Sequence, residues 1–233
     1  MQQKQDDTNN LVDKINEFIQ RNRKILFISI GTIIVLFAGL IIFLTLSNRF
    51  QRNSIAEVEV LVMRHSELRF QSNYDAAADE LLAELRIFAE RNSRWIFSFG
   101  PGVSGFASGR AWSLMGQIYS DRNDFYNAEL AWHNAAKTAS RTYLAPMAYF
   151  NAAIAAEEQG KLETAIEYYQ NSIDSKFAFP AAPRAQFSIG RLYEQLMNYP
   201  AAIEAYRQVL INWPAVTNWA NLAQSRIIAI EIK

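Results

Sequence analysis

Few of the residue types that carry out chemistry stand together in this sequence. It has no cysteine and two histidines, His65 and His133, which excludes a thiolate nucleophile, a thiolate metal site and most imidazole-based acid–base pairs. His65-Ser66-Glu67 has the spacing of the His-x-Glu of zinc deaminases, but that site also needs two cysteines. We therefore interpret both histidines as packing or helix-surface residues.

Two glycine-containing patterns partly match a nucleotide-binding or a catalytic motif. Gly100, Gly102 and Gly105 form G-x-G-x-x-G, but a dinucleotide-binding loop follows a strand, and helical patterns lie on both sides here. Ser104 is not the nucleophile of a G-x-S-x-G motif, because Phe106 stands where the last glycine belongs. We expect no catalytic residue, no cofactor and no metal, so the protein is predicted not to be an enzyme.

The overall composition is that of an ordinary folded chain. Of its 233 residues, 50% are apolar, and the 23 basic and 23 acidic side chains cancel. Wholesale disorder and a phosphate-neutralising surface are both unexpected, so nucleic acid is not a predicted partner. Alanines concentrate after residue 100, which favours closely packed helices.

One uncharged apolar run, residues 25–47, predicts a transmembrane helix. As a helix it is about 34 Å long, against about 30 Å for the hydrocarbon core of a bilayer. A cleavable signal peptide is the alternative, but its apolar region is shorter and ends at small residues, whereas this run ends at Thr45-Leu46-Ser47. A buried helix of a soluble core is a third interpretation, disfavoured by the basic residues at both ends of the run.

Basic residues near this run predict its orientation. Four of them precede it and two follow it within a similar distance: Lys14, Arg21, Arg23 and Lys24, against Arg49 and Arg52. This asymmetry favours a cytoplasmic N-terminus, with residues 1–24 as a cytoplasmic tail and residues 48–233 as an extracytoplasmic domain. Within the tail, Leu11, Val12, Ile15, Phe18 and Ile19 recur at helical spacing. They predict a short amphipathic helix on the membrane surface or, as the alternative, a partner-binding motif.

The remaining sequence repeats itself four times. NYDAAADELLAEL from Asn73 and NYPAAIEAYRQVL from Asn198 enclose two related segments, which begin at Asp124 and Lys161. The alanines that fix the register are Ala77, Ala128, Ala165 and Ala202, at intervals of 51, 37 and 37 residues. Such a period indicates stacked supersecondary units, because one such unit alone cannot bury its apolar face.

These repeats resemble the tetratricopeptide repeat (TPR). In first helices the resemblance rests on Trp112, Met115, Gly116 and Tyr119 and on Gln186, Ile189, Gly190 and Tyr193; in second helices it rests on Ala128 and Trp132, Ala165 and Tyr169, and Ala202 and Tyr206. The resemblance implies an all-α fold, with an α-solenoid of about four helical hairpins. Trp219, Leu222 and Ala223 form a further first helix without a partner, which is expected to cap the C-terminal end.

The first interval is longer than the others, and the surplus falls in residues 94–109. Four glycines and Pro101 predict a loop insertion there, although Trp95, Phe97 and Phe99 make it unusually apolar. It is expected either to fold back against the first repeat or to touch a partner or a membrane.

Transferring the groove positions of the TPR family gives a candidate protein-binding surface on the first helices. These positions are Arg110, Ser113 and Gln117, then Met147, Phe150, Ile154 and Glu157, then Arg184, Phe187, Arg191 and Glu194. Met147, Phe150 and Phe187 are expected to grip apolar side chains of an extended client, or else to be core residues covered by the C-terminal helix. Arg184 matches one position of the carboxylate clamp of some members, but the asparagines of that clamp are absent from this sequence.

The combination of amphipathic tail, single span and extracytoplasmic repeats resembles bacterial ancillary subunits of the Sec translocon and periplasmic TPR chaperones. This resemblance implies a single-pass protein of the bacterial inner membrane that binds client peptides or partner proteins, including the translocon or another envelope complex. The alternative is a structural scaffold of an envelope complex. The identity of the client and the oligomeric state stay open.

Overall fold

The computed structural model describes residues 2–70, 74–94 and 105–232, and within them the chain forms nine helices and no strand. The helices are α1 (Gln2–Leu68), α2 (Tyr74–Arg94), α3 (Phe106–Asp121), α4 (Phe125–Thr138), α5 (Leu144–Glu158), α6 (Leu162–Ile173), α7 (Ala182–Gln195), α8 (Tyr199–Asn212) and α9 (Thr217–Glu231). The predicted all-α fold is confirmed. The chain divides into two compact units, Met1–Asn48 and Arg49–Lys233.

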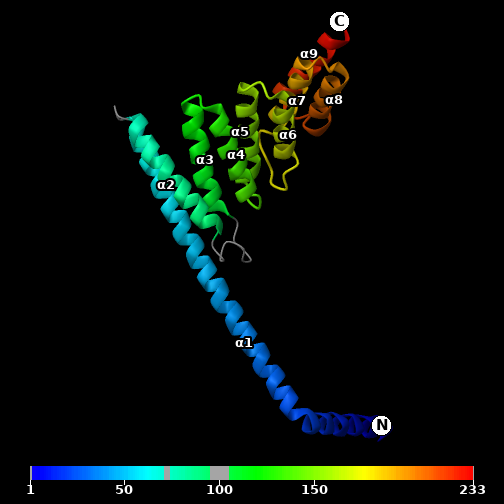
Figure 1. Ribbon diagram of the computed structural model, residues 1–233. Coiled ribbons are helices and arrows are strands. Elements are labelled where there is room, and N and C mark those ends of the chain that lie inside the picture. Colours follow the sequence, from blue (N-terminus) through cyan, green and yellow to red (C-terminus); the bar gives the residue numbers. More distant parts are fainter. Residues whose placement is uncertain (1, 71–73, 95–104, 233) are drawn as a thin grey trace. The chain divides into compact units, whose positions relative to one another are not determined.

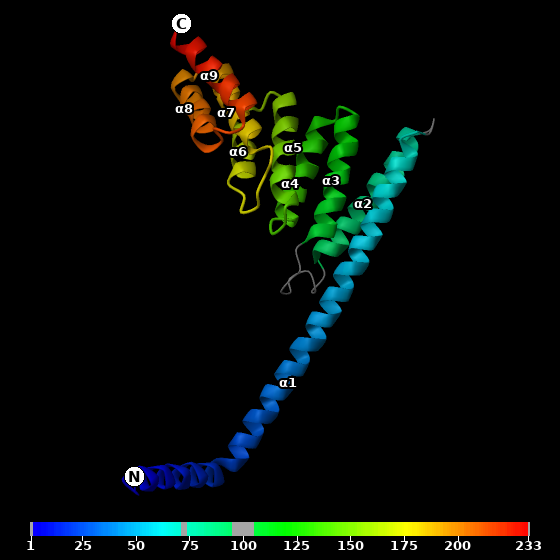
Figure 2. The same ribbon diagram turned by 180° about the vertical axis from the view of Figure 1, so that it is seen from behind.

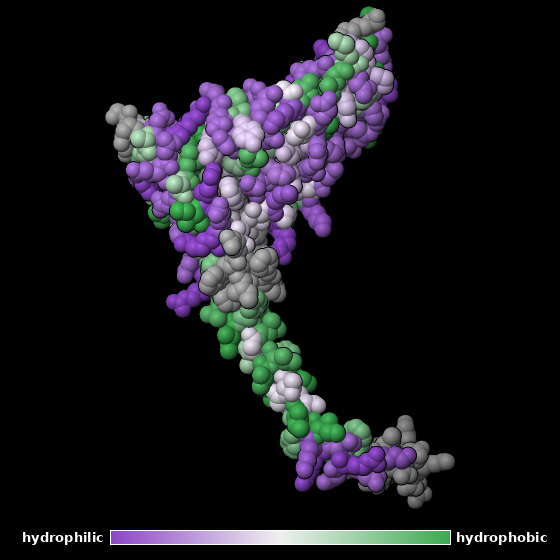
Figure 3. Space-filling model, in the orientation of Figure 1, coloured by the Kyte–Doolittle hydropathy of each residue, from purple (hydrophilic) through white to green (hydrophobic). Residues whose placement is uncertain are grey.

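The N-terminal unit is made of helix α1, which contains a segment long and apolar enough to cross a membrane. The side chains of this segment are exposed, as in Phe27 at 74% and Val35 at 70%, and apolar residues dominate its visible face in Figure 3. The amphipathic segment predicted before the apolar run is helical and is continuous with that run as the first part of helix α1. No proline stands between Phe18 and Ile25 to interrupt the backbone hydrogen bonds, which explains the continuity.

The polar side chains inside this apolar segment bond to the helix itself. The Thr32 hydroxyl donates to the carbonyl of Ile28 at 2.9 Å, and the Thr45 hydroxyl donates to the carbonyl of Ile41 at 2.8 Å. Such bonds to the preceding turn satisfy a hydroxyl without water. The segment therefore presents few unsatisfied polar groups to an apolar environment.

The second unit stacks helical hairpins in chain order. α1 from Arg49 onward pairs with α2, and α3–α4, α5–α6 and α7–α8 follow, each helix packing on the next (Figures 1 and 2). α9 packs on α8 and α7, and buries Ala223, Ile227 and Ile230 there. The four hairpins and the unpaired terminal helix agree with the predicted solenoid, and each boundary between hairpins buries apolar residues from both sides.

Glycines in two first helices let the second helices approach closely. A Cβ atom built at Gly116 would lie 2.7 Å from the ring of Trp132, and one at Gly190 would lie 2.6 Å from the ring of Tyr206. No side chain fits in this space, so the aromatic rings pack flat against the glycine backbone. The small residues at these positions are thus explained by ring packing within each hairpin.

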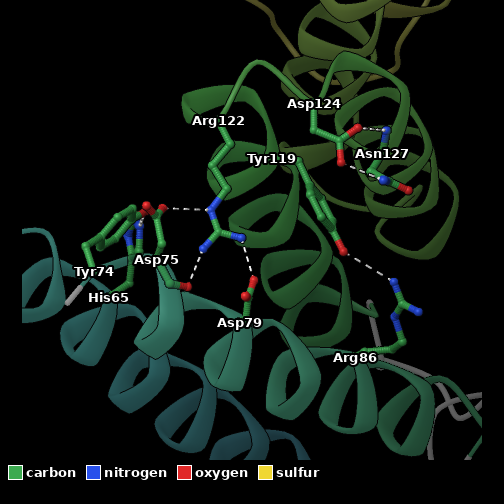
Figure 4. Close-up of polar contacts among 9 residues, drawn as sticks. All are labelled: His65, Tyr74, Asp75, Asp79, Arg86, Tyr119, Arg122, Asp124 and Asn127. Atoms are coloured by element: carbon green, nitrogen blue, oxygen red, sulfur yellow. Dashed lines mark hydrogen bonds and ion pairs between the residues drawn. The ribbon is translucent and has the colours of Figure 1, made fainter.

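The first and second hairpins are joined by Arg122, which lies just after α3. Its guanidinium donates to the Asp79 carboxylate and to the backbone carbonyl of Asp75, both at 2.6 Å (Figure 4). Nearby, the buried His65 of α1 lies 3.3 Å from the hydroxyl of Tyr74, the first residue of α2. These contacts hold the start of α2 against both neighbouring helices.

The predicted loop insertion, residues 94–109, falls mostly outside the described residues. Within its ends, Arg94 belongs to α2, and Phe106 to Gly109 form the first turn of α3, so the connection between the two helices is shorter than predicted. Gly109 lets α3 approach the end of α4 closely, because a Cβ atom built there would lie 2.5 Å from the Cβ of Ala139. The two interpretations of the loop itself stay predictions.

Candidate functional site

A hollow of about 400 Å³ opens between α3 and α5, on the face formed by the first helices. Its apolar lining comes from Leu114, Trp132, Leu144, Met147, Ile154 and Ala155, and its polar lining from Arg110, Ser113, Gln117, Ser120, Asp121 and Asn151. An apolar hollow with a few polar groups around it is the usual form of a recognition site. It is therefore the candidate functional site of the repeat unit.

Five of the eleven predicted groove residues line this hollow: Arg110, Ser113, Gln117, Met147 and Ile154. The sequence prediction missed Asn151, which also lines it. Met147, Asn151 and Ile154 are spaced at i, i+4 and i+7, which is one continuous face of α5. Asn151 could have been predicted from the sequence, because it follows from the helical spacing that starts at Met147, although the family positions alone do not include it.

Phe150, another predicted groove residue, is a core residue instead. It is 7% exposed, and its ring packs against the rings of Tyr169 and Phe179 at centroid distances of 5.3 and 5.6 Å. The guanidinium of Arg184 lies over the same ring, 5.1 Å from its centroid. Because the connection between α6 and α7 carries Phe179 onto α5, the position that the family leaves open is filled here.

Phe187 is also covered, in this case by the C-terminal helix. Its ring lies 5.1 Å from that of Tyr206 in α8 and 5.4 Å from that of Trp219 in α9. The C-terminal helix thus contacts Phe187, one of the three residues for which such a cover was the alternative interpretation. Of the three apolar residues expected to grip a client, Met147 alone lines the hollow.

The last three predicted groove residues, Glu157, Arg191 and Glu194, form two equivalent clusters that close the later repeat boundaries. At the α5–α7 boundary, the Glu157 carboxylate pairs with Arg191. Burial and this carboxylate raise the pKa of the neighbouring Tyr169 above its ordinary value. Each carboxylate is thus held by the next repeat.

At the α7–α9 boundary the same arrangement recurs. The Tyr206 hydroxyl donates to Glu194 at 2.6 Å, and Arg226 of α9 donates to the same carboxylate from its Nε at 2.9 Å. Burial, followed by the hydrogen bond to Glu194, raises the pKa of Tyr206. We call these two sets, Glu157–Tyr169–Arg191 and Glu194–Tyr206–Arg226, the Glu–Tyr–Arg clusters.

No such cluster exists at the α3–α5 boundary, because all three residue types differ there. One repeat before Glu157, Tyr169 and Arg191, the chain has Ser120, Trp132 and Ile154. These three residues themselves line the hollow. The hollow is therefore open where the other two boundaries are closed by a charged cluster.

The polar groups of the hollow have unequal access to partners. Ser113 is 4% exposed, and among the described residues its Oγ has no hydrogen-bond partner. Arg110 is already paired with Glu59 of α1, at 3.4 Å. A ligand in the hollow would thus meet an unpaired hydroxyl, two side-chain amides and the Asp121 carboxylate around an apolar centre, which suits a peptide backbone with an apolar side chain.

The comparisons with known proteins agree with this architecture. A family model described as tetratricopeptide repeat matches residues 113–176 and 175–216. The chain is 31% identical to a TPR repeat-containing protein of Treponema pallidum (strain Nichols), over 94% of each chain. The protein therefore belongs to the tetratricopeptide repeat family. Because the alignment covers nearly the whole chain, the similarity to that relative extends beyond the repeats into the N-terminal 47 residues.

Proposed function

We propose that this protein is a membrane-anchored, non-enzymatic TPR protein that binds an extended segment of a partner or client protein in the hollow between α3 and α5. Repeats of this family serve protein–protein interaction. The observation that carries the proposal is the replacement of a Glu–Tyr–Arg cluster by Ser120, Trp132 and Ile154 at this one boundary. An apolar side chain of the bound segment would contact Met147, Trp132 and Ile154.

The polar lining supports an extended protein segment as the ligand. The amides of Gln117 and Asn151 each offer a donor and an acceptor, which is the combination that a peptide group needs. The buried hydroxyl of Ser113 gains a partner when such a group binds, which removes the cost of leaving it unpaired. Binding energy would come mainly from the apolar contacts, and the orientation of the segment from the amides.

For the location, we propose the bacterial inner membrane, with α1 as a single-pass anchor and the repeats on the periplasmic side. The length and exposure of the apolar segment and the internal bonds of Thr32 and Thr45 support the anchor. The excess of basic residues before the segment supports the orientation. In that setting the ligands are newly exported chains or a subunit of the Sec translocon, and the protein acts as an ancillary or chaperone-like factor. The second function proposed at the sequence level, a scaffold of an envelope complex, uses the same site.

Site-specific photocrosslinking in cells tests this proposal. A benzophenone amino acid replaces Met147 in the hollow, and in a matched control it replaces Leu130 of α4. The two side chains have the same exposure, 46% and 45%, but only Met147 lines the hollow. We expect crosslinked proteins from position 147 and few from position 130.

The products also distinguish the functions. Many different exported chains at position 147 support the chaperone-like function, translocon subunits support the ancillary function, and one stoichiometric envelope protein supports the scaffold. Equal crosslinking at positions 147 and 130 would contradict the hollow as the binding site. Protease added to spheroplasts tests the orientation separately, because digestion of residues 48–233 requires that they face outward.

A further inference from the structure

A second hollow, of about 520 Å³, lies between α6 and α8, the second helices of two consecutive hairpins. Its apolar surface is formed by Ile166 of α6, Ile189 and Tyr193 of α7 and Ala205 of α8. It involves none of the residues that line the hollow between α3 and α5. A ligand here would be independent of the proposed function.

The charged side chains around this second hollow are all acidic. Glu163 and Glu167 stand one turn apart on α6, Glu204 stands opposite on α8, and no lysine or arginine lines the hollow. Among the described residues, none of the three carboxylates forms an ion pair. In contrast, Glu129, Glu157 and Glu194 elsewhere in the repeats are each paired with a basic side chain. The second hollow thus keeps three unpaired charges of one sign around an apolar floor.

This charge excludes several classes of ligand. Carboxylates repel the phosphates of nucleic acids and of anionic lipids, so neither fits the surface. The described residues also contain no group of three or more carboxylates or histidines placed to hold a metal ion. What remains is a ligand with both positive charge and apolar side chains.

We infer that the second hollow docks a basic amphipathic segment of a partner protein. Apolar side chains of that segment contact Ile166, Ile189 and Tyr193, while its lysines or arginines pair with Glu163 and Glu167 on one side and Glu204 on the other. A groove between two helices accommodates such a segment as a helix, whose apolar face is one stripe flanked by charge. The three carboxylates raise the association rate and set the sign of the partner's charge.

The experiment uses the full chain in phosphatidylcholine nanodiscs and a defined probe. The probe is a synthetic amphipathic helical peptide with leucines along one face and lysines along the other; a matched peptide carries glutamate in place of every lysine. Because the chain lacks cysteine, Asn171→Cys places a single environment-sensitive fluorophore at the edge of the hollow, and Glu158→Cys places the same fluorophore away from it. Empty nanodiscs give the background of lipid binding.

The decisive variant neutralises the three carboxylates, as Glu163→Gln, Glu167→Gln and Glu204→Gln together. Glutamine keeps the size and helix propensity. The favourable charge of Glu163 in the first turn of α6 is lost, but so is its repulsion with Glu167, and the two effects oppose each other. The matched control is Glu90→Gln with Glu158→Gln, two exposed carboxylates outside the hollow. Circular dichroism verifies that both variants fold.

We expect saturable binding of the basic peptide, seen by the fluorophore at position 171 and not at 158, and no binding of the acidic peptide. The triple variant should bind on the order of tenfold more weakly, and the control variant as the unmodified chain does, with the difference shrinking at high salt. Equal binding of both peptides, or unchanged affinity in a folded triple variant, would overturn the inference. Because Met147 and Trp132 lie elsewhere, failure here leaves the α3–α5 hollow untouched.

Discussion

The α3–α5 boundary and the α7–α9 boundary are built from the same repeat but differ at the three positions of the Glu–Tyr–Arg cluster. At the α7–α9 boundary, Tyr206 and Arg226 meet at the Glu194 carboxylate, and the space between the helices is filled. At the α3–α5 boundary, Trp132 takes the place of the tyrosine, and Ser120 and Ile154 take the places of the glutamate and the arginine. The comparison teaches that each hairpin uses a small residue beside an aromatic ring, and that the hairpins stack with or without the charged cluster.

The two boundaries should therefore respond differently when the aromatic ring is removed. Tyr206 is fully buried, so Tyr206→Ala leaves a cavity and removes one hydrogen-bond donor from the Glu194 carboxylate, which keeps its pairing with Arg226. We expect the free energy of unfolding to fall by about 3 to 5 kcal/mol. Trp132→Ala, next to an open hollow, should cost clearly less. Chemical denaturation followed by circular dichroism measures both.

If Trp132→Ala were as destabilising as Tyr206→Ala, the hollow would be a packing feature and not a binding site. Phenylalanine at position 206 provides the control for the hydroxyl. It keeps the ring and removes only the hydrogen bond to Glu194, so it should cost about 1 to 3 kcal/mol.

Grafting the closed boundary onto the open one tests the comparison directly. Ser120→Glu, Trp132→Tyr and Ile154→Arg together reproduce the Glu–Tyr–Arg cluster at the α3–α5 boundary, where their side chains would occupy the hollow. We expect crosslinking from position 147 to fall at least about tenfold, equivalent to about 1.4 kcal/mol of binding. The fold should be kept, because the two later boundaries already accommodate these residues.

The matched control grafts the same three changes in reverse at the α5–α7 boundary, as Glu157→Ser, Tyr169→Trp and Arg191→Ile. This variant leaves the α3–α5 hollow intact, so crosslinking from position 147 should be retained. Undiminished crosslinking in the first graft, once circular dichroism has verified its fold, would contradict the assignment of the hollow.

The repeat architecture could be predicted from the sequence because it depends on local, periodic features. The spacing of Ala128, Ala165 and Ala202 predicted the second helices, and Gly116 and Gly190 predicted the first helices. In the structure the two glycines lie against the rings of Trp132 and Tyr206, which explains why small residues stand there. These residues act within one hairpin. Their roles can therefore be predicted from the sequence without knowing which side chains of neighbouring hairpins are in contact.

The site could be predicted only in part, because burial depends on contacts between hairpins. Phe150 has the family position of a groove residue, but Phe179, from a connection that varies in length, covers it. The pairing of Glu157 with Arg191 requires knowing which side chains of consecutive repeats meet. The continuity of α1 was missed for a different reason, since composition changes along it while the backbone continues.

Helix α4 contains a histidine that should make stability depend on pH. His133 packs against Tyr149 and Tyr168, at ring-centroid distances of 6.3 and 5.3 Å. Burial, followed by the charge of Lys137, lowers the pKa of His133 below its ordinary 6.5, although Glu129 and Glu167 oppose this shift. The folded protein thus resists a proton that the unfolded chain accepts.

The contribution of His133 to the free energy of unfolding is complete above pH 6.5 and is lost progressively as the pH falls toward the lower folded pKa. Melting temperatures measured from pH 7.5 downward should therefore decrease, and His133→Gln should make the decrease shallower. Burial also lowers the pKa of His65, so the double variant with His65→Gln should be shallower still. An acid limb unchanged in the double variant would show that carboxylates alone cause it.

The smallest expected effect concerns the turns between first and second helices, which are equivalent in the three later hairpins. Asn123, Gly160 and Met197 occupy the same turn position with φ of 59°, 73° and 56°, and each donates its N–H to the first helix, at 3.0, 2.8 and 2.9 Å. A side chain in this left-handed region is disfavoured by about 1 to 2 kcal/mol. Met197 is 77% exposed, so little packing offsets that cost. Met197→Gly should raise the free energy of unfolding by about 0.5 kcal/mol, because relief of the strain exceeds the extra entropy of an unfolded glycine.

Gly160→Ala is the converse test. A Cβ there would meet no atom within 4 Å, so the expected loss of about 1 kcal/mol in the free energy of unfolding comes from the backbone alone. If both substitutions shifted the denaturation midpoint in the same direction, the three turns would not be energetically equivalent. The hairpins would then differ in their turns as well, and the difference between the boundaries could not be assigned to the Glu–Tyr–Arg clusters alone.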